Sequence, residues 1–171
     1  MKALQQLCSE KLIDKNDLQF QLAGSRSDIN SIEFAKMYNL ETIILQKGRV
    51  SHREALSSNI NSNLLILLIG DEEKHKRVYT GKIFDYLRSG IPILALAPKD
   101  GAVDKVLKET GHGKAFLSTQ TQEIKQMILD EYLKWKNNDG TERLYSPAIK
   151  RFERKALTSK LADIFNKVVH K

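Results

Sequence analysis

The residues best suited to chemistry lie in one segment, residues 79–94. Thr80 is predicted to cap a helix whose first turn holds Gly81 and Lys82. The free backbone N–H groups of that turn, the helix dipole and the Lys82 ammonium together suit a diphosphate. Asp85, about one turn further along, has a carboxylate that can accept hydrogen bonds from two vicinal hydroxyls. A crossover helix with a solvated lysine and aspartate explains the same residues, and by themselves they favour that plainer interpretation.

The segment belongs to a regular alternation of apolar runs and helical segments. The third and fourth runs are continuous, as is typical of strands buried on both faces of a parallel sheet. The alternation predicts an α/β fold, a Rossmann-like three-layer sandwich with about five parallel strands and a further helix in the first dozen residues. The runs cover residues 18–23, 42–46, 64–69, 91–97 and 113–117, and the helical segments cover residues 29–38, 51–59, 80–89, 102–110 and 122–136.

Glycine directly follows three of the predicted strands, at Gly24, Gly48 and Gly70. In open parallel sheets, ligands bind beyond the carboxyl ends of the strands, and glycine lets the backbone approach a ligand closely. Three such glycines on one rim strengthen the prediction of a ligand site there.

The chain changes character after a polar break at residues 137–141. Ser146-Pro147 is typical of a helix start. We therefore expect a Rossmann-like domain over residues 1–142, which lacks the first strand of the resembled family described below, and a basic amphipathic helical tail over residues 143–171. An apolar stripe on this tail consists of Leu157, Leu161, Ile164, Phe165 and Val168. We expect it to fold onto its own domain or onto a second copy of the chain, and of the two we favour self-association.

The net charge of +7 is concentrated in this tail. Residues 143–171 hold eight lysines and arginines against two acids, whereas residues 1–142 hold 20 against 19. The neutral body and the few aromatic side chains of the tail argue against a nucleic-acid partner, whereas the basic face suits an anionic membrane surface. No apolar run reaches the roughly 18 residues that span a bilayer, and the first residues lack a signal-peptide pattern. The expected location is the cytoplasm, with the inner face of the membrane as a further option.

Neither a disulfide nor a metal site is expected. Cys8 is the single cysteine of the sequence, and the four histidines are scattered without ligand spacing. No cofactor is predicted either.

The pattern Thr80-Gly-Lys-Ile-Phe-Asp-Tyr-Leu-x-Ser-Gly-x-Pro-Ile-Leu, followed by Asp100-Gly101 and a strand at Gly113, resembles the C-terminal domain of group-one, family-four type glycosyltransferases. The resemblance covers nearly the whole chain. It implies the GT-B architecture, in which two Rossmann-like domains face each other across a cleft. It also implies retaining transfer of a sugar from a UDP- or GDP-linked donor to a glycan or lipid-linked acceptor, as in bacterial polysaccharide biosynthesis, without an essential metal.

The resemblance also implies donor-binding roles where residues match. The turn at residues 48–50 would frame the base through its backbone, and the helix start at residues 80–82 would lie near the diphosphate. Asp85, where the family usually has glutamate, would bind the ribose hydroxyls. The implied donor-binding residues are Gly48, Arg49, Val50, Thr80, Gly81, Lys82 and Asp85.

The chain departs from the family pattern in two further places. Arg77 stands eight residues before Asp85, where the family usually has a glutamate near the transferred sugar. The family's domain opens with a strand and a glycine turn whose arginine and lysine grip the diphosphate, whereas this chain starts at the following helix. Either the five strands close up in the order 2-1-3-4-5 or another segment fills the gap, and we predict closing up. Without that strand and the N-terminal acceptor domain, the chain alone is expected to be inactive, and no catalytic residue is assigned.

Two other classes of protein remain open. One is a non-catalytic flavodoxin-like or nucleotide-binding module, for which residues 24–27 form a faint phosphate loop. The other is a fragment of a GT-B sugar-nucleotide epimerase, which needs catalytic carboxylates and a histidine in the cleft. His75 and His112 are isolated candidates for that histidine.

Overall fold

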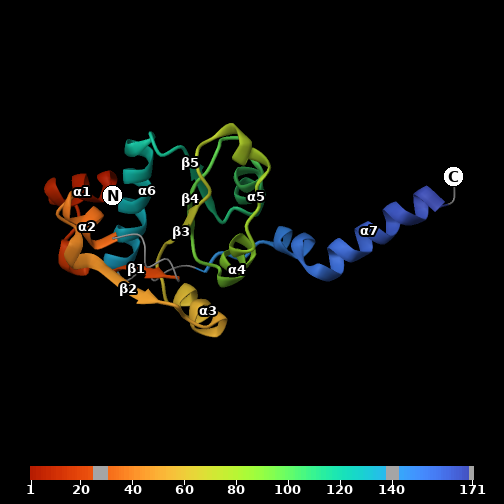
Figure 1. Ribbon diagram of the computed structural model, residues 1–171, viewed down its shortest axis with the longest axis horizontal. Coiled ribbons are helices and arrows are strands. Elements are labelled where there is room, and N and C mark those ends of the chain that lie inside the picture. The colour runs from red at the N-terminus through yellow and green to blue at the C-terminus, as the bar shows by residue number, and fades with distance from the viewer. Residues whose placement is uncertain (25–30, 138–142, 170–171) are drawn as a thin grey trace.

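The computed structural model describes residues 1–24, 31–137 and 143–169, in which strands and helices alternate as predicted (Figure 1). The α/β, Rossmann-like class is therefore confirmed. The helices are α1 (Lys2–Ser9), α2 (Ser31–Lys36), α3 (His52–Ile60), α4 (Lys82–Ser89), α5 (Ala102–Thr110), α6 (Thr121–Lys136) and α7 (Arg154–Val169). The strands are β1 (Phe20–Ala23), β2 (Ile44–Gly48), β3 (Leu65–Leu68), β4 (Ile93–Leu96) and β5 (Gly113–Phe116). Short 3-10 helices are η1 (Lys15–Asp17), η2 (Glu41–Ile43), η3 (Glu73–Arg77) and η4 (Pro147–Phe152).

The described strands form two separate parallel sheets rather than one sheet of five strands. β1 pairs with β2, and β4 lies between β3 and β5. The prediction that the strands close up in the order 2-1-3-4-5 is therefore wrong, because β1 and β3 do not pair. Each sheet lies beside its own buried cluster of apolar side chains, so burial alone does not bring the two edges together.

The larger core lies on the β3–β4–β5 sheet. Ile83 and Leu87 from α4, together with Val106 and Leu107 from α5, are buried in it. β5 begins at Gly113, which pairs in register with Ile93 of β4. A Cβ atom at position 113 would lie 1.9 Å from the Ile93 carbonyl oxygen. The two strands are therefore so close at this point that only glycine fits.

The smaller core belongs to the β1–β2 sheet. It is centred on Leu4 of α1, Ala35 of α2, Leu40 and Ile43. Helix α6 packs along α1 and binds the same unit through polar contacts. The Tyr132 hydroxyl donates to Asp17 Oδ2 at 2.5 Å, and Lys136 Nζ lies 2.8 Å from the same oxygen. These hydrogen bonds, first from Lys136 and then from Tyr132, hold the pKa of Asp17 below its usual value.

After α6 the chain returns to the larger core. The Leu144 backbone N–H donates to the Gly90 carbonyl at 2.7 Å. His112, which is fully buried, has Nδ1 2.8 Å from the Thr110 carbonyl oxygen and Nε2 2.9 Å from the Leu144 carbonyl oxygen. The His112 ring therefore fastens the returning segment to the end of α5.

The predicted helix start at Ser146 belongs to η4 rather than to the long helix. The Ser146 hydroxyl accepts a hydrogen bond from the Ala148 N–H at 3.3 Å, and α7 begins only at Arg154. α7 then projects away from the rest of the molecule (Figure 1), and none of its residues is buried. The apolar stripe therefore does not fold onto its own domain, which was one of the two expected outcomes. No helix among the described residues is long and apolar enough to cross a membrane.

Candidate functional site

The predicted diphosphate site lies at the start of α4, but the cap differs from the prediction. The N-cap residue is Gly81, and no side chain caps the helix. The predicted Thr80 side-chain cap is therefore wrong, although the Thr80 carbonyl accepts from the Ile83 N–H at 3.2 Å, next to the Gly81 carbonyl, which accepts from the Phe84 N–H at 3.2 Å. The Thr80 Oγ1 atom is instead buried and has no hydrogen-bond partner in the described structure. Burying a hydroxyl without a hydrogen-bond partner costs folding free energy, so we expect this hydroxyl to have a partner outside the described protein atoms.

Lys82 and Asp85 occupy the first turn of α4. Lys82 is exposed and Asp85 is partly buried. Within the described ranges, neither side chain makes a hydrogen bond or an ion pair. Burial, with a smaller contribution from the neighbouring Asp85 charge, raises the pKa of Tyr86. The structure thus brings together an ammonium and a carboxylate that are both available to a ligand.

The predicted base-framing turn, Gly48-Arg49-Val50, lies between β2 and α3. The Gly48 carbonyl accepts from the Gly24 N–H at 2.8 Å, which ties the ends of β1 and β2 together. α3 opens with a capping box between Ser51 and Glu54 and packs against α4. The turn therefore precedes the helix that neighbours Lys82 and Asp85. Residues 25–27, part of the faint phosphate loop, lie outside the described residues.

An open cavity of about 420 Å³ adjoins the approach to α4. Three of its lining side chains are cationic, and one, Asp100, is acidic. None of the predicted donor-binding residues lines it, although Tyr79 immediately precedes Thr80. The cavity is lined by Lys76, Arg77, Tyr79, Asp100, Ala102 and Lys105. Lys76 is paired with Glu73 at 2.9 Å, whereas Arg77 and Lys105 have no ion pair among the described residues, and cations around one hollow suit an anionic ligand.

Sequence reasoning missed this cationic cluster. Arg77 was interpreted only as a departure from the family pattern, and Lys105 was not singled out. The charged run at residues 71–77 could have indicated that Lys76 and Arg77 belong to such a cluster. No sequence signal indicated Lys105, because it reaches the cavity only through the packing of α5 against η3.

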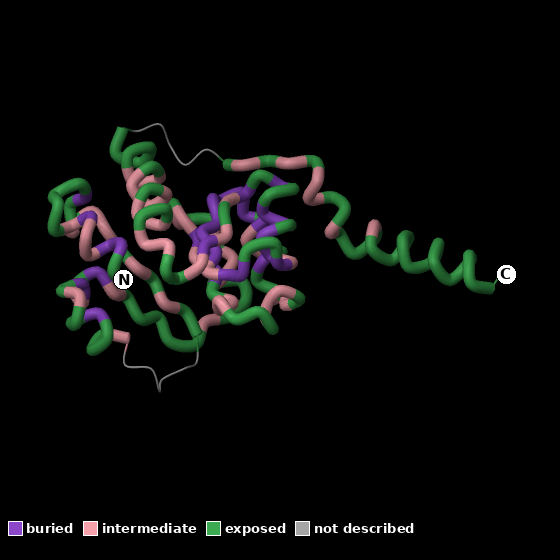
Figure 2. The backbone as a smooth tube through the Cα atoms, turned by 90° about the horizontal axis from the view of Figure 1, so that it is seen from above, coloured by how far each residue is buried: buried purple, intermediate pink, exposed green. Residues whose placement is uncertain are grey.

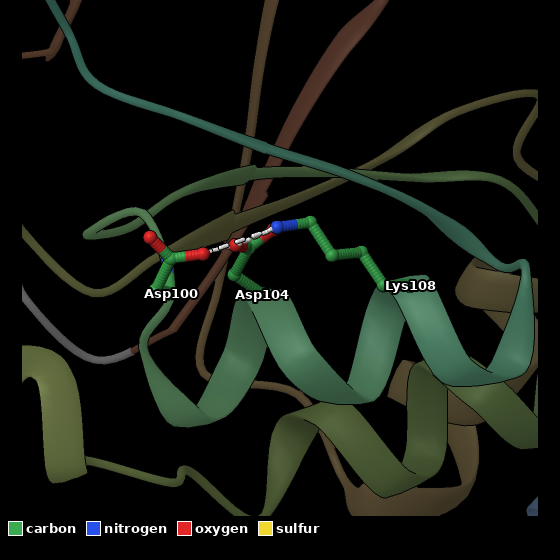
Figure 3. A network of polar contacts seen from close by, with 3 residues as sticks. All are labelled: Asp100, Asp104 and Lys108. Atoms are coloured by element: carbon green, nitrogen blue, oxygen red, sulfur yellow. Dashed lines mark hydrogen bonds and ion pairs between the residues drawn. The ribbon is translucent and has the colours of Figure 1, made fainter.

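A polar network fixes the turn between β4 and α5 at the edge of this cavity (Figure 3). The carboxylate of Asp104, which is buried, accepts from the Asp100 backbone N–H at 2.8 Å and from Lys108 Nζ at 2.7 Å. The Asp104 hydrogen bond raises the pKa of Lys108. Gly101 completes the turn, because a Cβ atom there would lie 2.9 Å from the Pro98 carbonyl oxygen and 3.3 Å from the Lys76 backbone. The turn and η3 are thus held in close contact.

Metal ligands are not gathered at this site. Among the described residues, no group of three or more histidine, cysteine, aspartate or glutamate side chains is placed to hold a metal ion. Of the two candidates for an epimerase histidine, His75 lies against Gly70 and His112 is fully buried.

No family model matches the sequence, and no curated protein matches it. Among solved structures, a similar one is the crystal structure of the pneumococcal O-GlcNAc transferase GtfA in complex with UDP and GlcNAc. The chain has the fold of one part of that glycosyltransferase. The match has a TM-score of 0.61 at 16% identity and covers 99% of this chain and 32% of the GtfA chain. This chain therefore spans about a third of the length of the GtfA chain, and the likeness establishes the fold.

Proposed function

We propose that this chain is the donor-binding domain of a GT-B glycosyltransferase of the group-one, family-four type. It would serve retaining transfer of a hexosyl group from a nucleoside diphosphate to a glycan or lipid-linked acceptor, in the cytoplasm. The observation that carries the proposal is the start of α4, where Lys82 and Asp85 lack side-chain partners among the described residues and the Thr80 hydroxyl is buried without one. The fold shared with GtfA, which was crystallised with UDP and GlcNAc, supports this class of ligand.

Each group at the α4 start has a defined task in this proposal. The first N–H groups of the helix and the Lys82 ammonium bind the diphosphate. The Asp85 carboxylate accepts hydrogen bonds from the two ribose hydroxyls. The turn Gly48-Arg49-Val50 frames the base. These contacts bind and orient the donor.

The cationic cavity extends the proposal toward the reacting end of the donor. Lys76, Arg77 and Lys105 line one side of the approach to α4. In the transfer, the bond between the sugar and the diphosphate breaks and negative charge develops on the leaving diphosphate. Cations fixed beside that charge stabilise the transition state, which is usually the largest catalytic contribution. They supply this charge stabilisation without requiring a metal ion.

Nucleotide binding tests the proposal most directly. We expect UDP or GDP to bind, and Asp85→Asn to weaken that binding about tenfold by removing a charge-assisted hydrogen bond. Lys82→Ala should weaken binding of the diphosphate more than binding of uridine or guanosine, because the ammonium contacts only the phosphates. Isothermal titration calorimetry with both nucleotides and both nucleosides measures each effect.

Matched controls are available elsewhere on the chain. Asp130→Asn on α6 and Lys36→Ala on α2 make the same chemical changes at exposed positions and should leave affinity unchanged. If Asp85→Asn binds as tightly as the wild type while Lys82→Ala binds less tightly, the ribose assignment is wrong. Tight binding of FMN with no response to UDP or GDP would replace the proposal with a flavodoxin-like module.

A second expected result concerns turnover by this chain alone. We expect no release of UDP or GDP from a panel of nucleotide sugars above a blank without protein, even with an acceptor mixture present. The chain spans about a third of the GtfA chain, and the proposal places the acceptor site on a domain outside this sequence. A coupled assay for free nucleoside diphosphate makes the measurement, and release above the blank would contradict the expectation.

A further inference from the structure

The cavity beside the approach to α4 has a richer chemistry than a diphosphate alone requires. Its lining combines cations, one carboxylate and one aromatic ring, contributed by Lys76, Arg77, Lys105, Asp100 and Tyr79. Its volume of about 420 Å³ lies within the range of roughly 300–1,000 Å³ that small-molecule sites have. The cavity therefore has room for a further part of a donor beside its diphosphate.

Two cations of the cavity are available to a ligand. Arg77 ends η3 and Lys105 lies near the start of α5, and both residues are exposed. Neither side chain has an ion pair in the ranges that the structure describes. Ala102, the first residue of α5, also lines the cavity, and no side chain caps this helix. The N–H groups and the positive dipole end at its start add to the attraction for an anion.

The type of cation indicates the type of anion. A guanidinium is planar and donates two parallel hydrogen bonds to a carboxylate, and an ammonium beside it contributes a further charge-assisted bond. Asp104, the acid in the first turn of α5, is held by the Asp100 N–H and by Lys108 (Figure 3). The Asp104 carboxylate therefore does not occupy Arg77 or Lys105.

The rest of the lining suits the neutral parts of a sugar. Tyr79 is 51% exposed, and its ring stacks on Phe84 with centroids 6.4 Å apart. A half-exposed ring held by such a neighbour can pack against the apolar face of a sugar ring. Asp100 has one carboxylate oxygen 3.4 Å from Lys108 Nζ, and its other oxygen can accept hydrogen bonds from sugar hydroxyls.

The elements that carry these groups are anchored in the larger core. Figure 2 shows buried residues gathered in this part of the molecule, among them Ile83 of α4 and Val106 of α5. A Cβ atom at Gly101 would lie 3.3 Å from the Lys76 backbone, so η3 and the start of α5 are in close contact. The backbone positions of Arg77 and Lys105 are therefore fixed relative to each other.

The simpler ligands each leave part of this lining unexplained. A neutral sugar would use Tyr79 and Asp100 but would offer no charge to the two cations. An inorganic anion would use the cations but would meet repulsion from the Asp100 carboxylate. A sugar that itself carries a carboxylate matches all of these groups.

We propose that the donor carries a hexuronic acid, whose carboxylate is bound by Arg77 and Lys105 and whose ring lies against Tyr79. Asp100 accepts hydrogen bonds from the hydroxyls of this sugar. The inference rests on the proposed function and deepens it, because it names the class of sugar at the reacting end of the same donor. The α4 start binds the diphosphate, and the cavity binds the sugar attached to it.

Calorimetric titration with matched pairs of nucleotide sugars tests the proposal. UDP-glucuronic acid and UDP-glucose differ only in a carboxylate in place of a hydroxymethyl group, as do GDP-mannuronic acid and GDP-mannose. In the pair whose nucleotide binds, the uronic acid should bind about tenfold more tightly than the neutral sugar, because it gains charge-assisted hydrogen bonds. Arg77→Gln and Lys105→Gln should each lower this preference to about threefold or less.

Matched controls test whether the effect belongs to the cavity. Arg88→Gln on α4 and Lys114→Gln on β5 make the same chemical changes at exposed positions, and both should keep the tenfold preference. All four variants should melt within a few degrees of the wild type, since substitutions of exposed side chains usually change stability by about 0.5 kcal/mol or less.

Failure of this inference and failure of the proposed function give different results. If UDP or GDP binds but the uronic acid and the neutral sugar bind equally, the inference is wrong and the proposed function is unaffected. A tenfold preference that survives both Arg77→Gln and Lys105→Gln would also overturn the inference, because the carboxylate would then lie elsewhere. If neither nucleotide nor any member of the pairs binds, both proposals are wrong.

Discussion

Gly113→Ala should destabilise the protein by about 4 kcal/mol or more, enough to unfold much of a marginally stable domain. The new Cβ atom would lie 1.9 Å from the Ile93 carbonyl oxygen and 2.7 Å from its carbonyl carbon. These atoms belong to the backbone of the central strand β4, so they cannot move aside without breaking the pairing of β4 with β5. The φ angle of 147° at Gly113 is also one that L-residues rarely adopt. Urea unfolding followed by circular dichroism measures the loss.

Gly111→Ala is the matched control for this substitution. Gly111 also has a positive φ angle, 67°, but a Cβ atom there would meet nothing within 4 Å. Gly111→Ala should lower the free energy of unfolding only by the cost of placing alanine in the left-handed conformation, about 1–2 kcal/mol. Similar losses from the two substitutions would show that the close approach of β4 and β5 at Gly113 is not present.

His112→Ala should destabilise the protein by about 3–5 kcal/mol. The ring is fully buried, so its removal leaves a cavity. It also leaves whichever of the Thr110 and Leu144 carbonyl oxygens accepts the ring N–H, at 2.8 or 2.9 Å from its ring nitrogen, without a donor, and a buried unsatisfied acceptor costs about 1–3 kcal/mol. Thermal unfolding gives the total loss of stability.

Limited proteolysis distinguishes the fastening role of His112 from simple packing. Cleavage after Arg143 should accelerate in His112→Ala, because the Leu144 segment loses one of its links to the larger core. His112→Leu restores apolar volume but not the ring N–H donor, so its cleavage should also be faster than in the wild type. The exposed His52→Ala on α3 should change stability by about 0.5 kcal/mol or less. Wild-type cleavage in both His112 variants would contradict the fastening role.

Local signals were enough to predict most of the elements. The predicted helical segment 80–89 ends where α4 ends, at Ser89, and helix α5 has the predicted bounds, Ala102 to Thr110. Such boundaries are set by residues close in sequence, through caps, glycines and apolar spacing. The predicted Thr80 cap is wrong, because no side chain caps α4 and the Thr80 hydroxyl is buried without a partner. Residue type alone does not decide whether a threonine before a helix caps it.

The separation of the two sheets was not predictable in this way. The apolar pattern of β1 and β3 shows that each is a strand, but it does not show which edges pair. The stripe on α7 has the same limitation, since its spacing identifies an apolar face without indicating what covers it. At the candidate site, the roles implied for Lys82 and Asp85 stay predictions, although the structure leaves both side chains available to a ligand. Lys105 could not be assigned to the cavity from the sequence, because its place there depends on the packing of α5 against η3.

The two-sheet arrangement also has a consequence for partial unfolding of the molecule. Among the described residues, the buried cluster on β3–β4–β5 has eleven members, whereas the cluster beside β1–β2 has four. We therefore expect the smaller unit to open as a separate cooperative unit at a lower free energy, with its amides exchanging with solvent through partial unfolding. The Gly48–Val50 turn belongs to this unit, whereas Lys82 and Asp85 belong to the larger one. A ligand that contacts both halves would bind only the closed state, and its binding energy would suppress the partial unfolding and couple the two units into one.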